Sequence, residues 1–411
     1  MRVLFISNLY PPYEVGGMEQ LCQEVMDGLR ERGHACHILT SRHGVRGGPP
    51  PEVGVTRALH LEADMYHYRP LDFFVRRPWQ ERANRRALRA AQDDFEPDII
   101  FVWGMWNLSR NVAYWAERWL PGRVAYYVAS YWLMEPNAHQ AYWRQQARRP
   151  WARALMAPAR GLALRLLAQE RASHALALER VACVSECVRR KLTEAGALPH
   201  GAHVIYNGID PQPFLGAAAE REASCGQLRL VYTGGLARHK GVHTAIEALG
   251  MLHRRGQADG LHLDIIGGGH PGYEGDLRRR VEELGLGDLV TFLGRVARNE
   301  IPAILAEHDA FLFLSVWEEP IARSVMEAMV AGLVVAGTAV GGQREMLEDG
   351  VNALVFPPED ADALAECILR LRWDPDLRYR LAQAGQHTVL ERFTLERMVD
   401  EMEAWLSSIS P

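Results

Sequence analysis

Two glutamates, Glu319 and Glu327, lie eight positions apart in the stretch EEPIARSVMEAM. Paired carboxylates often carry out acid–base chemistry on one bond. Here FLFLS, before Glu319, favours a buried strand, and ARSVMEAMVAG, around Glu327, favours a helix. Eight residues of helix span roughly 12 Å, whereas glycosidase carboxyl pairs stand about 5 to 9.5 Å apart. The pair is therefore expected to bind two separated parts of one elongated ligand. The alternative is two exposed helix acids without a function.

Glycine-bearing loops elsewhere in the chain favour an anionic ligand. In YTGGLARHKGV, glycines that allow close backbone approach precede Arg238 and Lys240, although the spacing differs from that of an ATP-binding loop. Gly16 and Gly17 precede a predicted helix, whose first N–H groups favour phosphate. Two further glycines, at 341–342, follow another predicted strand. Each loop alone is equally consistent with an ordinary turn, but together they predict a diphosphate with a hydroxylated group at each end.

These loops are set in a chain that alternates short apolar runs with longer amphipathic segments. The predicted strands are RVLFIS, ACHILTS, PDIIFVW, GRVAYYVA, VACVS, LRLVYTG, HLDIIGGG, VTFLG, AFLFLS, LVVAG and ALVFP. This alternation is typical of doubly wound parallel sheets, and 411 residues are too many for one core. We predict α/β domains at 1–208 and 209–385, followed by a helix at 386–411.

Residues 138–180 interrupt the first domain with a basic, tryptophan-bearing and helix-prone segment. One interpretation is an inserted pair of solvated helices. The other is a flap that binds the acceptor or an anionic membrane surface, to which an amphipathic helix with Arg and Trp is suited.

Composition excludes several classes of function. The net charge of −5 gives no general attraction to nucleic acid. The six cysteines do not form a disulfide framework, and Cys183 and Cys187 lack a second pair at zinc-like spacing, so buried thiols are expected. No window approaches 18 apolar residues, which favours a cytoplasmic protein.

Taken in order, the motifs resemble a known family. They run from SNLYPPYEVGGMEQL through VIYNGID, YTGGLARHKGV, DIIGGG and VTFLGRV to EEPIARSVMEAMVAG and GGQREMLEDGVNALVFPPED. The chain resembles the retaining, nucleotide-sugar-dependent glycosyltransferases of family 4. The resemblance implies the GT-B fold, in which two Rossmann-like domains face each other across a cleft. It also implies that the last helix returns to the N-terminal domain.

The resemblance also implies roles for individual residues. Glu327 corresponds to the glutamate that binds the ribose hydroxyls, and Glu319 to the glutamate at the donor sugar. Lys240 corresponds to the basic residue whose positive charge neutralises the diphosphate. Further donor-binding positions are Gly16, Gly17, Gly235, Val296, Ser315, Ile321 and Ala322. Acceptor-binding positions are Ser130, Tyr131 and Trp132, although Tyr131 and Trp132 are equally expected to pack in the first domain's core.

Several positions depart from the family's usual pattern. Gly235 stands where arginine is common, and we expect Arg238 to supply that charge. Ile321-Ala322 replaces the frequent Phe-Gly, and Ser130 lies near a position that often holds Asp or His; Trp103 likewise stands where histidine is frequent. These departures motivate an alternative function, that of a catalytically silent relative that binds a nucleotide-sugar or glycan and supports a partner enzyme.

The expected reaction transfers a sugar from a UDP- or GDP-linked donor to an acceptor hydroxyl with retained configuration. It needs no cofactor and no metal. The sequence DAD at 360–362 mimics a metal-binding motif, but it stands at a predicted helix start, where acids are ordinary. A dinucleotide oxidoreductase is disfavoured because no G-x-G-x-x-G opens either domain.

Overall fold

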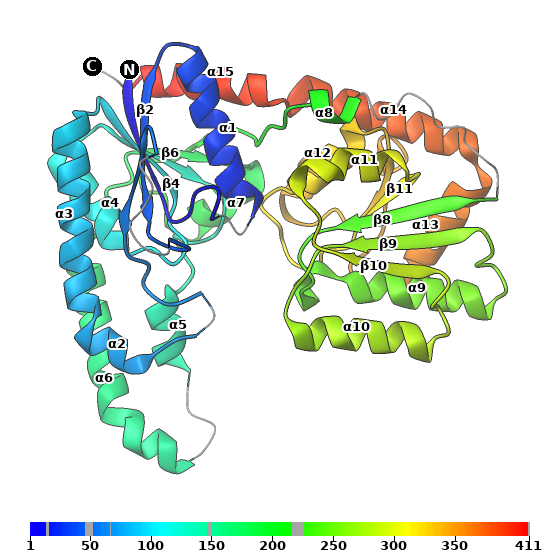
Figure 1. Cartoon of the computed structure of the whole chain (residues 1–411), viewed down its shortest axis with the longest axis horizontal. Helices are drawn as coiled ribbons and strands as arrows, with labels where there is room; N and C mark the ends of the chain where they lie inside the picture. The colour runs from blue at the N-terminus through cyan, green and yellow to red at the C-terminus, as the bar shows by residue number, and fades with distance from the viewer. Residues whose placement is uncertain (14–15, 46–51, 66, 146–149, 216–225, 410–411) are drawn as a thin grey trace. The chain divides into compact units, whose positions relative to one another are not determined.

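The computed structural model in Figure 1 describes residues 1–13, 16–45, 52–65, 67–145, 150–215 and 226–409. Its internal contacts divide the chain into two compact units. Unit 1 contains Met1–Ile205 and Val399–Pro411, and unit 2 contains Tyr206–Met398. Each unit is built around its own parallel sheet.

The described residues of unit 1 form a seven-stranded parallel sheet in the order β3-β2-β1-β4-β5-β6-β7. Its strands are β1 (Arg2–Ser7), β2 (Ala35–Ser41), β3 (Val55–Leu59), β4 (Ile99–Gly104), β5 (Val124–Val128), β6 (Arg180–Cys183) and β7 (His203–Val204). The central strands β1, β4 and β5 are buried along nearly their whole length, which explains their continuous apolar runs.

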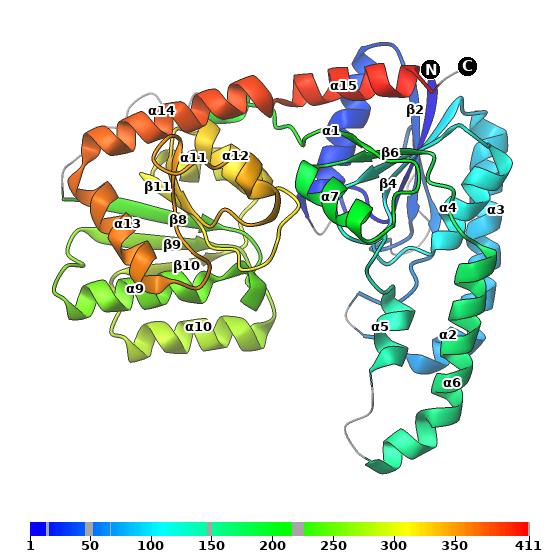
Figure 2. The ribbon, with the colours of Figure 1, turned by 180° about the vertical axis from the view of Figure 1, so that it is seen from behind.

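Helices cover both faces of this sheet, as Figures 1 and 2 show. The helices of unit 1 are α1 (Gly17–Glu31), α2 (Pro70–Val75), α3 (Arg77–Phe95), α4 (Arg110–Trp119), α5 (Ala138–Arg144), α6 (Pro150–Ser173) and α7 (Glu186–Glu194). Helices α1, α3 and α7 pack on strands of the sheet, whereas α2 packs on α3 and α5 packs on α6. The described part of the segment at 138–180 thus contains two helices, α5 and α6, as predicted. Trp143 of α5 packs with Phe73 of α2 and Leu167 of α6 in a small separate core.

The last helix, α15 (Leu395–Ser407), completes the core of unit 1. Val399, Met402 and Leu406 are buried on it. A Cβ atom on Gly28 of α1 would lie 3.0 Å from Val399, so the two helices pack closely there. His34 also contacts the carboxylate of Glu403, at 2.7 Å.

The described residues of unit 2 form a six-stranded parallel sheet in the order β10-β9-β8-β11-β12-β13. Its strands are β8 (Leu228–Thr233), β9 (Leu261–Ile266), β10 (Val290–Gly294), β11 (Ala310–Phe313), β12 (Val334–Gly337) and β13 (Ala353–Val355). The predicted pair of doubly wound parallel sheets is confirmed.

The helices of unit 2 also lie on both sides of its sheet (Figures 1 and 2). They are α8 (Gln212–Leu215), α9 (Val242–Arg254), α10 (Pro271–Glu283), α11 (Ile301–Ala306), α12 (Arg323–Val330), α13 (Ala361–Trp373) and α14 (Pro375–Arg392). Short 3₁₀ segments are η1 (Arg238–Lys240), η2 (Arg298–Glu300) and η3 (Gly341–Glu345). Helix α9 packs against α10 and α13, and α12 packs against α14. Of the helices in the described ranges, none is both long and apolar enough to cross a membrane.

Candidate active site

Glu319 lies in the loop between β11 and α12, and its side chain is buried. The ammonium group of Lys240 donates a hydrogen bond to its Oε1 atom, and the hydroxyl of Ser315 donates to the same atom at 3.0 Å. A buried carboxylate is costly unless it is paired and hydrogen-bonded, and this one has both kinds of partner. The sequence-predicted residues Glu319, Lys240 and Ser315 are therefore brought together.

The loop after β8 places Lys240 next to this carboxylate. The backbone N–H of Val316 donates to the carbonyl of His239 at 2.9 Å, which docks η1 on the β11 loop. Gly241 follows with a φ of 73°, and a Cβ atom there would overlap the Leu314 carbonyl oxygen. Glycine is therefore required for this close approach.

The loop after β12 supports Glu319 from another side. The backbone N–H of Gly342 donates to the carbonyl of Glu319 at 2.8 Å. Gly341 has a φ of 60°, and a Cβ atom on it would overlap the same carbonyl oxygen. The glycines at 341–342, expected in a ligand-facing loop, therefore also hold the backbone of the acidic loop.

Glu327 lies on α12, where it is buried. The guanidinium of Arg298, in η2, donates a hydrogen bond to its Oε1 atom and forms an ion pair with it. Val296 lies between β10 and η2 and is half-buried. The sequence analysis did not assign a role to Arg298, because 29 residues separate it from Glu327.

Two of the departing positions, Gly235 and Ile321-Ala322, lie in the loops after β8 and β11 of this sheet. Gly235 is exposed, and its carbonyl accepts a hydrogen bond from the Tyr232 hydroxyl at 3.0 Å. Arg238 is exposed on η1. Ile321 is buried, and Ala322 is the N-cap residue of α12 but has no side chain that can cap the helix. The first N–H groups of α12 therefore receive no hydrogen bond from their N-cap residue.

Two titratable side chains respond to the charges of this cluster. Partial burial and the neighbouring Lys240 lower the pKa of His239, which disfavours its protonated imidazole. Burial and the nearby Glu319 raise the pKa of Tyr232, whose hydroxyl stays protonated. In both side chains the environment therefore favours the uncharged form beside Lys240 and Glu319.

In unit 1, Gly16 is the N-cap residue of α1 and Gly17 is its first residue. Both are exposed. The backbone N–H of Gly16 donates to the carboxylate of Glu19 at 3.0 Å. A carboxylate therefore stands where the sequence predicts a phosphate.

The predicted acceptor residues have different surroundings. Tyr131 is buried, with the ammonium of Lys191 5.2 Å from its ring centroid, so it packs in the core. Trp132 is half-buried and lines a pocket, and Ser130 is half-buried. Trp103, which stands where histidine is frequent in the family, is buried. Its indole Nε1–H donates to the Met18 carbonyl at 2.9 Å.

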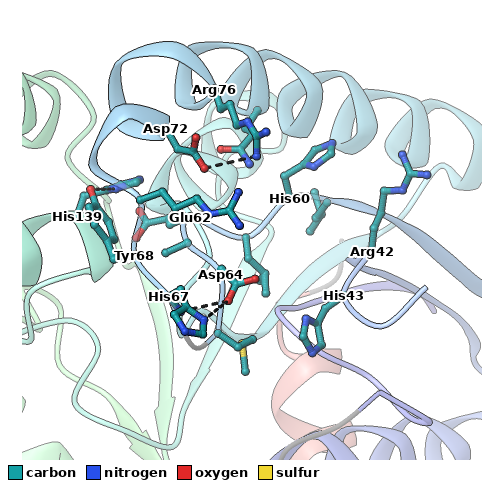
Figure 3. A pocket seen from close by; sticks show the side chains of 16 residues that line it. Arg42, His43, His60, Glu62, Asp64, His67, Tyr68, Asp72, Arg76 and His139 are labelled. Carbon is teal, nitrogen blue, oxygen red and sulfur yellow. Dashed lines mark hydrogen bonds and ion pairs between the residues drawn. The ribbon is translucent and has the colours of Figure 1, made fainter. Parts of the chain in front are cut away.

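A polar pocket of about 310 Å³ opens in unit 1 near the ends of β2 and β3. Figure 3 shows Arg42, His60 and Glu62 lining it. The hydroxyl of Tyr68 lies 2.8 Å from Nδ1 of His139, which joins this wall to helix α5. The sequence analysis missed this pocket because its lining comes from segments far apart in the chain.

Neither carboxylate cluster resembles a metal centre. Within the described ranges, no three His, Cys, Asp or Glu side chains gather as metal ligands do. In the DAD sequence, Asp360 caps α13 by accepting from the N–H of Ala363, and Asp362 pairs with Arg255.

The described cysteines are all buried, as the sequence predicts; they are Cys22, Cys36, Cys183, Cys187 and Cys367.

Both halves of the chain match known protein families. Residues 15–213 match the family described as Glycosyltransferase Family 4, and residues 219–388 match the one described as Glycosyl transferases group 1. The chain belongs to glycosyltransferase family 4.

This family 4 chain has curated relatives at moderate identity. It is 30% identical over 229 residues to the 2-deoxystreptamine glucosyltransferase of Streptomyces kanamyceticus. The aligned region covers 53% of this chain and 58% of the relative. It is 27% identical over 238 residues to the GDP-mannose-dependent alpha-(1-6)-phosphatidylinositol monomannoside mannosyltransferase of Mycobacterium tuberculosis, with coverages of 55% and 61%. The chain therefore spans less than two thirds of the length of these relatives.

A solved structure extends the likeness over the whole family 4 chain. The Anabaena protein HepE, in complex with UDP and glucose, gives a TM-score of 0.68 at 21% identity, with coverages of 99% and 100%. At this identity the likeness shows the fold alone. Together with the two parallel sheets, it confirms the GT-B fold.

Proposed function

We propose that this glycosyltransferase moves a sugar from a nucleoside-diphosphate donor to an acceptor hydroxyl in glycan or glycoconjugate biosynthesis. The observation that carries the proposal is the buried Glu319, held by Lys240 and Ser315 beside the N-terminus of α12. A carboxylate can accept hydrogen bonds from sugar hydroxyls, and the cations and helix N–H groups favour a diphosphate. A nucleotide-sugar contains both kinds of group, a hydroxylated sugar and a diphosphate.

The proposed chemistry follows from where charge develops. The bond between the anomeric carbon and the diphosphate oxygen breaks, leaving positive charge on the sugar and negative charge on the diphosphate. Lys240, Arg238 and the backbone N–H groups at Ile321 and Ala322 stabilise the departing diphosphate by preorganised electrostatics. The acceptor oxygen then bonds to the anomeric carbon on the same face, and its proton passes to the leaving phosphate oxygen. Configuration is retained, and neither a metal nor a dedicated protein base takes part.

Glu327 is proposed to bind the ribose hydroxyls, with Val296 presenting its backbone to the base. Gly16, Gly17 and Gly235 would let loop backbone approach the diphosphate. The base is proposed to be uracil or guanine. HepE was solved with UDP, and the mycobacterial relative is named for GDP-mannose, so the relatives support both.

The deciding experiment is a thermal-shift screen with UDP, GDP, ADP and their sugars, followed by transfer assays with the donors that bind. A ligand that binds the native state raises the melting temperature. NMR of the product then gives its anomeric configuration. Inversion would contradict the mechanism, and binding without hydrolysis or transfer across donors and acceptors would favour a catalytically silent relative.

We also propose that α6 lets the enzyme contact a membrane surface peripherally. Trp151, Leu155 and Leu162 are exposed on this helix, which also carries Arg160 and Arg165. Such a helix suits an interface with anionic lipids. Cosedimentation with vesicles of anionic and of neutral lipid tests the proposal, with Leu155→Glu expected to reduce binding and Trp373→Ala, in unit 2, expected to leave it unchanged.

A further inference from the structure

A second pocket in unit 1, of about 490 Å³, has no role in the donor chemistry described above. Its walls come from the segments that follow β3, β4 and β5. Open α/β sheets bind ligands outside the carboxyl ends of their strands, and this pocket lies there. It shares Asp64, His67 and Tyr68 with the polar pocket of Figure 3.

Trp106 is the most exposed large aromatic side chain of this pocket, with 53% of its surface accessible. The next residue, Asn107, holds it there. Asn107 has a φ of 55°, a left-handed conformation that asparagine tolerates better than most residues. Its side-chain amide donates to the Ala63 carbonyl at 2.8 Å and accepts from the Ala63 N–H at 3.1 Å. The loop is thus fixed in a form that keeps a tryptophan in solvent, although burying such a side chain is normally favourable.

Trp132, Tyr68 and Tyr142 also line this pocket. Trp132 is half-buried, with the guanidinium of Arg110 5.4 Å from its ring centroid, and Arg110 also donates to the Trp132 carbonyl. Tyr68 and Tyr142 stack with ring centroids 4.2 Å apart and an interplanar angle of 20°. These contacts fix the aromatic faces before any ligand arrives, which lowers the ordering cost of binding.

Hydrogen-bonding side chains surround the aromatic groups. Glu135 and Gln145 are exposed in the pocket wall, and Asn137 lies between them in sequence. A saccharide ring has one face of C–H groups and a rim of hydroxyls, so it needs an aromatic face together with carboxylate and amide groups. A phosphate group fits less well, because Arg110 already donates to two backbone carbonyls and lies over Trp132.

We propose that this pocket binds a saccharide ring of the acceptor, stacked on Trp106 and hydrogen-bonded through Glu135 and Gln145. That the ring belongs to the acceptor rests on the proposed function; that the pocket binds a saccharide rests on the pocket itself. The acceptor class is therefore a glycan or glycoside that carries at least one sugar before transfer.

Saturation-transfer difference NMR tests this directly. The probes are the methyl glycosides of glucose, mannose, galactose, rhamnose and N-acetylglucosamine at millimolar concentration, with sorbitol as an open-chain control. At least one glycoside should receive saturation, strongest on the protons of one ring face, and sorbitol should receive little. Trp106→Ala should weaken binding by about fivefold or more, the size expected for loss of one aromatic stack. Trp106→Tyr should retain most of it.

The matched control is Trp79→Ala, because Trp79 is 57% exposed in the same unit and lies outside the pocket. It should leave glycoside binding unchanged. Undiminished saturation in Trp106→Ala, or no glycoside bound by the wild-type protein, would overturn the proposal. Thermal shifts with UDP and GDP, measured on the same variants, separate the two proposals. Glycoside binding without any nucleotide shift would retain the saccharide pocket and remove the donor function.

Discussion

Lys240 donates a hydrogen bond to the carboxylate of Glu319, although 79 residues separate them in the chain. The contact also forms an ion pair, so the cation and the carboxylate are each other's partners within unit 2. A diphosphate that engages Lys240 would compete with Glu319 for this ammonium group, leaving the carboxylate free to accept hydrogen bonds from the sugar. The two proposed roles are thereby coupled through a single contact.

Glu319→Ala is expected to separate turnover from nucleotide binding. Removing the carboxylate removes the proposed contact to the sugar but releases Lys240 toward the diphosphate. Turnover should fall by about 100-fold or more, as for loss of one preorganised transition-state contact. Affinity for the nucleoside diphosphate should stay the same or rise. Initial rates and titration calorimetry measure both, with Glu318→Ala as the neighbouring-glutamate control. Wild-type turnover in Glu319→Ala would rule out the donor-sugar role.

Glu327 should be responsible for discrimination between ribose and deoxyribose. If its carboxylate accepts from the ribose hydroxyls, the wild-type enzyme should bind UDP or GDP about tenfold or more tightly than the 2′-deoxy analogue, in line with a charged hydrogen bond. Glu327→Ala should bind both nucleotides with similar affinity. Calorimetry on the four combinations isolates the contact, and Glu307→Ala, an exposed carboxylate of the same unit, is the control. If Glu327→Ala keeps the wild-type ratio of affinities for the ribose and the 2′-deoxy nucleotide, Glu327 does not bind the ribose hydroxyls.

Arg298 is expected to compete for the same carboxylate. Its ion pair with Glu327 must loosen if ribose hydroxyls take its place. Arg298→Ala should therefore tighten nucleotide binding or leave it unchanged, provided that Arg298 does not itself contact the nucleotide. The calorimetric measurement is the same, and the double variant Arg298→Ala with Glu327→Ala completes the cycle. Weaker binding in Arg298→Ala would instead assign the guanidinium a direct contact with the nucleotide.

Gly341→Ala should damage the site more than a matched glycine change elsewhere. Gly341 and Gly256 both have positive φ values, 60° and 64°, so each alanine variant carries a conformational cost of about 1 to 2 kcal/mol. A Cβ atom at 341 also overlaps the Glu319 carbonyl oxygen, whereas at 256 no heavy atom lies within 4 Å. Gly341→Ala should therefore lower both the melting temperature and the turnover further. Equal effects in the two variants would show that the approach to Glu319 is not tight.

The stability of unit 1 should fall with rising pH because of Glu62. Burial raises the pKa of this carboxyl from 4.5 to about 8, and the nearby Glu81 and Glu170 add to the rise, while Arg77 opposes it. The folded state therefore holds a proton that the unfolded state loses above pH 4.5. The stabilising contribution is complete below pH 4.5 and falls progressively until pH is about 8.

Glu62→Gln removes this titration while keeping an oxygen that can accept from Asn137, which donates to Glu62 at 2.9 Å. Melting temperatures are measured from pH 5 to 9. The melting temperature of Glu62→Gln should increase relative to that of the wild type as the pH rises. Glu31→Gln, at an exposed position, serves as the control for charge alone. Parallel profiles for Glu62→Gln and the wild type would contradict the prediction.

The strands that bear the candidate donor site were predictable because each is an apolar run inside a parallel sheet. Such runs fix where the strands end, and the carboxyl ends of parallel strands meet at one edge. The loops that carry Lys240, Ser315 and Glu319 were therefore expected together, and the structure brings them into contact. Their proposed roles still await the experiments above.

Strand β3 was missed because a charge interrupts its apolar pattern. Arg57 in VTRAL is buried, paired with Glu52 at 2.9 Å, and donates to the carbonyls of Tyr10 and Pro11. Local composition cannot reveal partners that stand 46 and 47 residues away. From the sequence pattern alone, such an arginine is predicted to face solvent.

Trp132 of the proposed saccharide pocket was predicted to bind the acceptor, but Trp106 was not, for a similar reason. In FVWGMWNLS, Trp103 and Trp106 are both plausible core residues. The structure buries Trp103 and exposes Trp106, and the difference depends on the two hydrogen bonds between Asn107 and Ala63. Those bonds join segments 44 residues apart.

The return of α15 to unit 1 has a consequence for synthesis on the ribosome. Val399, Met402 and Leu406 belong to the core of unit 1, yet they are translated after all of unit 2. Domains generally fold as they emerge, N-terminal first. Here the unit that emerges first is completed last, and until then the apolar face of α1 that receives Val399 stays uncovered. A premature stop codon just before 399 would therefore leave unit 2 whole and damage the domain at the opposite end of the gene.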